Sequence, residues 1–167
     1  EMCIRDSMLA SLSGDIETVQ TLLDNGALID VTHSDGFTAL IGACAISNVD
    51  IVALLIEKGA DVNKVAKSGK SALSGAAEVG NIEIVNMLLA AGAEVDSKMK
   101  NGTTPLMEAV VRGHTEIAKA LIGHGADVKV RNARNETVLH RAILTHNSEI
   151  SELLTEHQAD LESRWSN

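Results

Sequence analysis

The sequence predicts an all-α solenoid in which short helix-turn-helix units stack side by side and are joined by β-hairpin-like loops. A short block of residues recurs five times at a fixed interval of 33 residues, without insertion or deletion. Aromatic side chains are nearly absent, with one Phe and one Trp, although 45% of the residues are hydrophobic. An aliphatic core without large rings suits thin layers of closely packed helices. A unit of 33 residues cannot bury its own apolar face, so the units must stack.

Three separate blocks keep this period. Copies of the first block occupy residues 25–30, 58–63, 91–96, 124–129 and 157–162. Copies of the second occupy 36–40, 69–73, 102–106 and 135–140, and copies of the third include 14–19, 80–85 and 113–118. Three blocks in one fixed order are far more specific than any single motif.

The first helix of each unit follows the second block. In one copy Ser71 is predicted to cap the helix, because its hydroxyl can accept a hydrogen bond from an early helical N–H. Leu73, Ala76 and Ala77 then form one apolar face at i, i+3 and i+4 spacing, and Gly80 ends the helix. The capping position of the other units holds Thr38, Thr104 and Thr137.

The second helix of the same unit is predicted to begin near Asn81 or Ile82. Gly92 follows as a C-terminal stop, because glycine tolerates the left-handed conformation. The next segment is an extended loop with Asn101-Gly102 at its tip, and this dipeptide favours a tight hairpin turn. The apolar face of the helix comprises Ile84, Val85, Met87, Leu88 and Leu89.

These motifs resemble those of ankyrin-repeat proteins. The best match is Gly102-Thr103-Thr104-Pro105-Leu106, followed by Ala109, Gly113-His114, Leu121 and Gly125-Ala126-Asp127-Val128. The resemblance implies an ankyrin-repeat domain over residues 8–167, with repeats at about 8–34, 35–67, 68–100, 101–133 and 134–167. It also places His114 and His140 where histidines of the family form hydrogen bonds between loops and helices.

Both ends depart from the pattern. Residues 1–7 lack the expected motif, so we interpret them as a non-native or disordered leader. In the last copy Ser151 and Thr155 replace apolar residues, and Gln158 replaces the glycine of the first block. A more polar outer face suits a terminal repeat, which indicates a C-terminal cap.

Composition excludes several classes of function. A formal net charge of −9 and a pI of about 5.0 disfavour a nucleic-acid binder, which needs cations to neutralise phosphates. Cys3 and Cys44 form neither a disulfide framework nor a zinc motif, and we expect Cys44 to be buried. No apolar run reaches the length of about 18 residues that a membrane span requires. With no signal peptide we expect a cytoplasmic protein.

The search for catalytic motifs yields none. Gly69-Lys70-Ser71 resembles the end of a P-loop, but Lys64 stands where that motif requires glycine. The six histidines lack metal-binding spacing, and a site joining His140 and His146 would lack a third ligand. We therefore predict no enzyme activity, no catalytic residue, no metal and no cofactor.

The family resemblance implies a protein-protein interaction module or scaffold, which binds through a concave groove formed by hairpin tips and first helices. Phe37 is either an exposed binding aromatic or packs against its own hairpin. The alternative function is a regulatory ankyrin segment of a larger multidomain enzyme or channel. The candidate partner-binding residues are Asp35, Phe37, Ile46, Lys67, Lys70, Glu78, Lys100, Thr103, Arg112, Arg134 and Glu136.

Basic residues gather in the hairpin segments, which hold eight of the 14 Lys and Arg residues. One hypothesis is a protein partner that brings acidic groups to this edge, and the alternative is ordinary solvated lysines. We expect no nucleic-acid or membrane partner, and a monomeric chain. The eight residues are Lys64, Lys67, Lys70, Lys98, Lys100, Lys129, Arg131 and Arg134.

Overall fold

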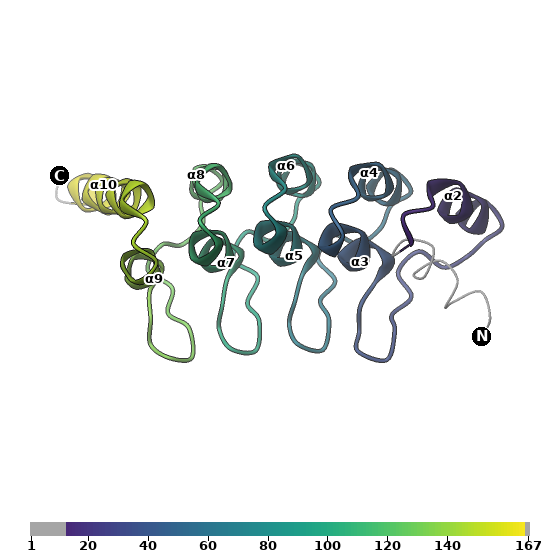
Figure 1. Cartoon of the computed structure of the whole chain (residues 1–167), viewed down its shortest axis with the longest axis horizontal. Coiled ribbons are helices and arrows are strands. Elements are labelled where there is room, and N and C mark those ends of the chain that lie inside the picture. Colours follow the sequence, from purple (N-terminus) through teal and green to yellow (C-terminus); the bar gives the residue numbers. More distant parts are fainter. Residues whose placement is uncertain (1–12, 166–167) are drawn as a thin grey trace.

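The computed structural model describes residues 13–165, and side chains as far as residue 157. The expected leader at residues 1–7 therefore lies outside the described residues, as does the start of the first repeat. The helices form two parallel rows (Figure 1). The first helices of the units are α3 (Ala39–Ala45), α5 (Ala72–Val79), α7 (Pro105–Arg112) and α9 (Val138–Leu144). The second helices are α2 (Ile16–Asp24), α4 (Val49–Glu57), α6 (Ile82–Ala90), α8 (Thr115–Gly123) and α10 (Ser148–Trp165).

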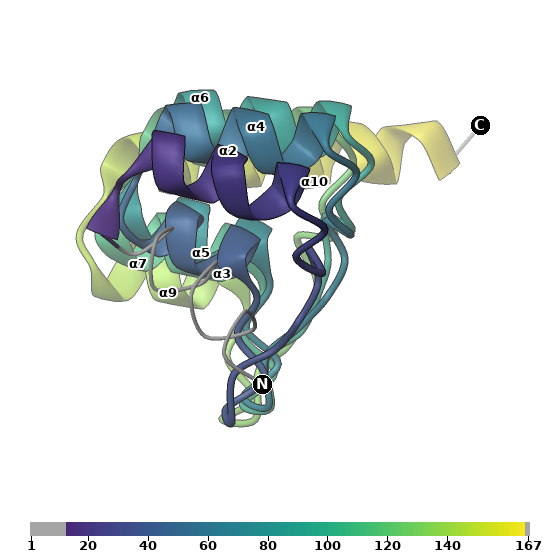
Figure 2. The same ribbon diagram turned by 90° about the vertical axis from the view of Figure 1, so that its right-hand side faces the viewer.

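Each helix packs against its counterpart in the next unit. Helix α5 lies between α3 and α7, while α6 lies between α4 and α8. The loops between units project from one side of the stack as narrow hairpins (Figure 2). In the described part of the chain the only β-pairing consists of isolated bridges, Val65 to Ser71 and Arg131 to Thr137. The predicted all-α solenoid with hairpin-like loops is thus confirmed.

Local signals at the helix ends act as the sequence predicts. The Ser71 hydroxyl accepts a hydrogen bond from the Ser74 N–H at 3.1 Å. Pro105 is the first residue of α7, where its missing N–H removes no helical bond. Gly80 and Gly113 end their helices with φ of +94° and +76°. Equivalent caps are provided by Thr38, Thr104 and Thr137.

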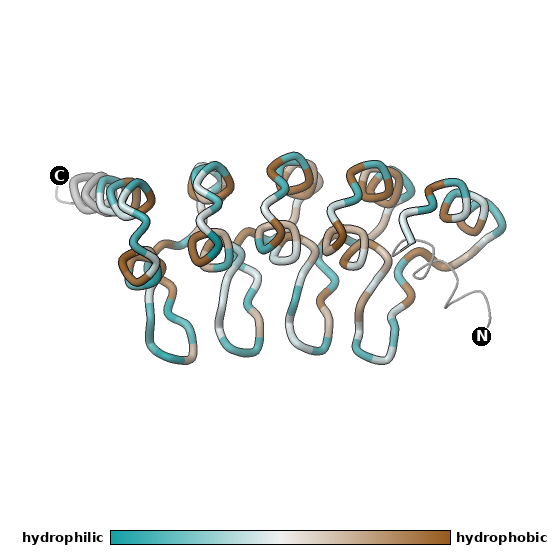
Figure 3. Tube along the Cα trace, in the orientation of Figure 1, coloured by the Kyte–Doolittle hydropathy of each residue, from teal (hydrophilic) through white to brown (hydrophobic). Residues whose placement is uncertain are grey.

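The core lies between the two rows of helices and is almost purely aliphatic. Leu73, Leu88 and Leu121 are fully buried, as is Cys44. Burial raises the pKa of the Cys44 thiol to about 12, so the thiol stays protonated and behaves as a small apolar group. Hydrophobic residues concentrate in the helices, whereas the hairpins mix hydrophilic, intermediate and hydrophobic residues (Figure 3).

The hairpin turn is longer than the expected tight Asn-Gly turn. The Met99 N–H donates to the Thr103 carbonyl at 3.0 Å, and the Gly102 N–H donates back to the Met99 carbonyl at 2.8 Å. Three residues therefore form the loop, and Gly102 closes it with φ of +74°. A two-residue type I′ turn would require positive φ at Asn101 as well as at Gly102, and Asn101 does not have it.

Two sets of hydrogen bonds join each hairpin to the one before it. Near the tip, the Lys100 N–H donates to the Ser68 carbonyl at 2.9 Å, and the Lys67 N–H donates to the Asp35 carbonyl at 2.8 Å. Near the helices, the side chains of Asp30, Asn63 and Asp96 accept hydrogen bonds from the backbone of Asp61, Glu94 and Asp127. These bonds fix the register of neighbouring units.

The fifth copy of the first block does not form a loop. Helix α10 runs from Ser148 to Trp165 and passes through residue 158. In the preceding units the corresponding glycines, such as Gly92 and Gly125, both have φ of +86°. Gln158 has a Cβ, which disfavours this left-handed stop, and the helix continues.

We predict that Leu88→Ala lowers the free energy of unfolding by about 2–5 kcal/mol, because it empties a fully buried site. The matched control is Leu28→Ala, since Leu28 is 70% exposed and should change stability by less than about 0.5 kcal/mol. Urea unfolding followed by circular dichroism gives both values. Equal losses in the two variants would contradict the assigned core.

A second pair of variants tests the contact between hairpins. Gly59 and Gly69 both have positive φ, but a Cβ at Gly59 meets no atom within 4 Å, while one at Gly69 lies 2.8 Å from the Met99 Cα. We expect Gly59→Ala to cost about 1–2 kcal/mol for the left-handed backbone alone. Gly69→Ala should cost about 1–3 kcal/mol more from overpacking, again by urea unfolding.

Candidate functional site

The predicted partner-binding residues lie on the hairpins and the first helices. Asp35, Lys67, Lys100 and Arg134 are exposed on the hairpins. Ile46, just after α3, is 42% exposed. The hairpins project from the side of the stack on which the first helices lie (Figure 2).

Phe37 is half-buried and packs against the hydrophobic core. This placement favours a structural role over that of an exposed aromatic at a tip. Its contribution to partner binding stays a prediction.

Three of the predicted residues form an ion network across two units. Glu78 in α5 accepts from Lys70 Nζ at 2.6 Å through Oε2 and from Arg112 Nη2 at 2.7 Å through Oε1. The hydrogen bond from Lys70 lowers the pKa of Glu78, although partial burial acts in the opposite direction. The network therefore connects α5, α7 and the hairpin segment that holds Lys70. Both cations, Lys70 and Arg112, are paired with Glu78.

The two framework histidines behave differently. His114 Nε2 lies 3.2 Å from the Glu78 backbone carbonyl, a hydrogen bond between units of the kind that the family resemblance implies. His140 is exposed, and within the described residues its only hydrogen bond outside the helix is from its backbone N–H to Thr137. The expectation for the His140 side chain was therefore wrong, because within the described residues this side chain forms no hydrogen bond to another unit.

A second ion pair lies one unit further along the stack. Arg141 Nη1 in α9 is 3.3 Å from Glu136 Oε2, and Asn132 Nδ2 donates to the same oxygen at 2.8 Å. The hydrogen bond from Asn132 lowers the pKa of Glu136. Glu136 is thus held inside its own hairpin and against the helix that follows.

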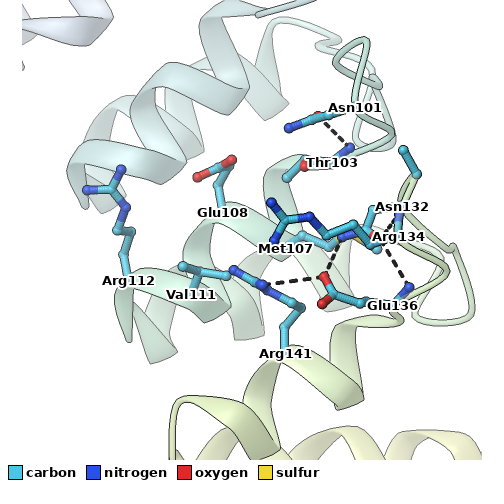
Figure 4. A pocket seen from close by; sticks show the side chains of 11 residues that line it. Asn101, Thr103, Met107, Glu108, Val111, Arg112, Asn132, Arg134, Glu136 and Arg141 are labelled. Carbon is cyan, nitrogen blue, oxygen red and sulfur yellow. Dashed lines mark hydrogen bonds and ion pairs between the residues drawn. The ribbon is translucent and has the colours of Figure 1, made fainter.

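A pocket of about 320 Å³ is lined by Arg112 of the first ion network and by Glu136 and Arg141 of the second ion pair (Figure 4). It lies between α7, α9 and the two adjacent hairpins. Four of the predicted binding residues line it, namely Thr103, Arg112, Arg134 and Glu136. The remaining lining residues are Asn101, Met107, Glu108, Val111, Asn132, Ala133 and Arg141.

Glu108 in this pocket was not among the predicted site residues. It is half-buried, and its side chain forms no hydrogen bond or ion pair within the described part of the chain. Burial is the main cause that raises the pKa of Glu108, and the negative charge of Glu78 adds to it. The period could have found it, since Gly42, Gly75 and Arg141 occupy the equivalent positions. A charged residue at a position where two other units hold a buried glycine is the signal.

The described residues contain no group of three or more His, Cys, Asp or Glu side chains that could hold a metal ion. Among the described helices, none is long and apolar enough to cross a membrane.

Comparison with known proteins gives one positive result. A family model described as ankyrin repeats, in three copies, matches residues 7–99 and again residues 76–164. The two matches overlap and together extend from residue 7 to residue 164. A search of curated proteins found no match.

The opposite pKa shifts of Glu78 and Glu108 predict opposite effects of neutralising them. The lowered pKa of Glu78 means that its ionised form stabilises the fold above the ordinary value of 4.5, and this stability is lost as the pH falls through the lowered pKa. Glu78→Gln should therefore cost about 1 kcal/mol at pH 7 and progressively less at acidic pH.

For Glu108 the raised pKa means that the ionised form destabilises the fold, so Glu108→Gln should increase stability at pH 7. This advantage should shrink as the pH falls and the wild-type carboxylate takes up a proton. Urea unfolding between pH 3 and pH 7 measures both variants. Two variants with the same sign of effect at pH 7 would refute the assignment.

Proposed function

Because the chain belongs to the ankyrin-repeat family, we propose that it is a non-catalytic protein-binding module whose partner lies along the groove of hairpin tips and first helices. Ankyrin repeats generally mediate protein-protein interaction. The observation that carries the proposal is the row of exposed tips from successive units, held in register by backbone hydrogen bonds such as Lys100 to Ser68. A rigid row of this kind needs little ordering when a partner binds, which favours affinity.

The proposed partner brings acidic groups to the basic hairpins. Lys70 is already paired with Glu78, so it contributes little free charge. Lys67 and Lys100 are exposed and form no ion pair within the described residues. The other exposed cations of the hairpins are Lys98, Lys129, Arg131 and Arg134. The monomeric state and the cytoplasmic setting stay predictions.

The test starts from a partner captured with the intact chain, purified, and measured by isothermal titration calorimetry. We expect the double variant Lys67→Glu and Lys100→Glu to bind about tenfold or more weakly, because it places like charges opposite each other. The matched control is Lys58→Glu with Lys119→Glu. It changes the net charge by the same amount on the row of second helices, at exposed lysines that pair with Asp24 and with Glu116 and Glu149, so urea unfolding must verify that this variant is folded.

The control variant should bind like the wild type, and wild-type affinity should fall as salt is added. An equal loss in both double variants would indicate a general charge effect, and no loss in either would remove the hairpin edge from the interface.

A further inference from the structure

The Glu108 carboxylate is not paired with the one cation of its own helix, because Arg112 bonds Glu78 instead. In the unit before it, Lys70 and Glu78 pair across Gly75. In the unit after it, Glu136 pairs with Arg141, which occupies the position equivalent to Glu108. The residues of its own unit equivalent to Lys70 and Glu78 are Thr103 and Val111, and both are uncharged.

The three cations whose charges act on Glu108 are already occupied. Lys70 and Arg112 bind the Glu78 carboxylate, and Arg141 binds Glu136. Their positive charges lower the pKa of Glu108, but burial and the charge of Glu78 outweigh them. What Glu108 lacks is therefore a direct hydrogen-bond donor, since a carboxylate that accepts N–H bonds has a lowered pKa.

We propose that this pocket receives an arginine side chain of the protein partner, whose guanidinium donates hydrogen bonds to Glu108. The proposal rests on the proposed function and specifies the chemistry of one contact within it. A guanidinium presents two parallel N–H donors that match both carboxylate oxygens, whereas an ammonium acts as a point charge.

The size and walls of the pocket suit this occupant. Its volume of about 320 Å³ falls at the lower end of the range for ligand pockets, roughly 300–1,000 Å³. Val111 lines the same pocket and offers apolar contact to the methylene stem of an arginine, while Met107 beneath it is buried in the core.

The Arg134 side chain extends from its hairpin across the pocket (Figure 4). It forms no ion pair within the described residues. A partner guanidinium must displace this positive charge, so Arg134 opposes entry of a cation. Arg134 would instead favour entry of an anion. A variant at Arg134 therefore distinguishes a cationic occupant from an anionic one.

The experiment uses the full chain and N-acetyl-arginine amide as the probe, with binding followed by NMR chemical shifts and by the carboxyl ¹³C signal of Glu108. The matched control probe is N-acetyl-citrulline amide, which has a similar shape and no charge. We expect the arginine probe to bind with millimolar affinity, to shift signals of residues 103–111, and to lower the pKa of Glu108. The citrulline probe should bind at least tenfold more weakly.

Two variants complete the test. Glu108→Gln should weaken binding of the arginine probe about tenfold, to the level of the citrulline probe, because the charge-assisted hydrogen bonds are lost. Arg134→Ala should strengthen it severalfold, because the competing charge is removed. Urea unfolding verifies that both variants are folded.

The proposal is overturned if Glu108→Gln leaves arginine binding unchanged, or if the citrulline probe binds equally well. It is also overturned if N-acetyl-aspartate amide binds in this pocket more tightly than the arginine probe and Arg134→Ala abolishes that binding, which would identify an anion site. None of these results bears on the hairpin-edge test, because that test measures how partner binding depends on Lys67 and Lys100.

Discussion

The backbone hydrogen bond from each hairpin to the preceding hairpin holds the stack in register. Lys100 N–H reaches the Ser68 carbonyl only because Gly69, beside it, has no Cβ to meet the Met99 backbone at 2.8 Å. Gly69 also closes its own turn with φ of +82°, so two independent constraints require the same glycine. A residue inserted within the turn would break both, and this favours a turn of constant length in all four hairpins.

The helix ends, which depend on a few neighbouring residues, could be predicted from the sequence. The ion pairs between units, which depend on the conformations of long side chains, could not. The Ser71 cap, the Pro105 start and the Gly80 stop each depend on one residue type in one backbone conformation. The extension of α10 through Gln158 follows the same rule, because this copy lacks the glycine that follows the second helix in the other units. Pairing of Lys70 and Arg112 with Glu78 depends on rotamers in two units, and sequence spacing carries no such information.

The net charge of the whole chain is negative, but the charge of the face that carries the hairpins is different. Acidic residues recur in the first turn of the second helices, where the N-terminal end of the helix dipole stabilises negative charge. These residues lie in the row of helices away from the hairpins (Figure 1). The charge of −9 is therefore partly a consequence of how each unit folds, and it coexists with a basic edge. The first-turn acids are Glu17, Asp50, Glu83, Glu116 and Glu149.

The chemistry specific to this chain arises where the units differ. Across Gly75 the long Lys70 side chain lies flat, with its Cε 3.6 Å from the place a Cβ would occupy, and it fills that part of the groove. One unit further, the short Thr103 cannot cover the larger Glu108, so a hollow remains between them. The fold tolerates both the pair Lys70 and Gly75 and the pair Thr103 and Glu108, because none of these residues belongs to the hydrophobic core. Shared framework residues therefore explain the stack, while an exchange of side-chain size at two open positions creates the pocket, which is why family membership alone does not identify what it binds.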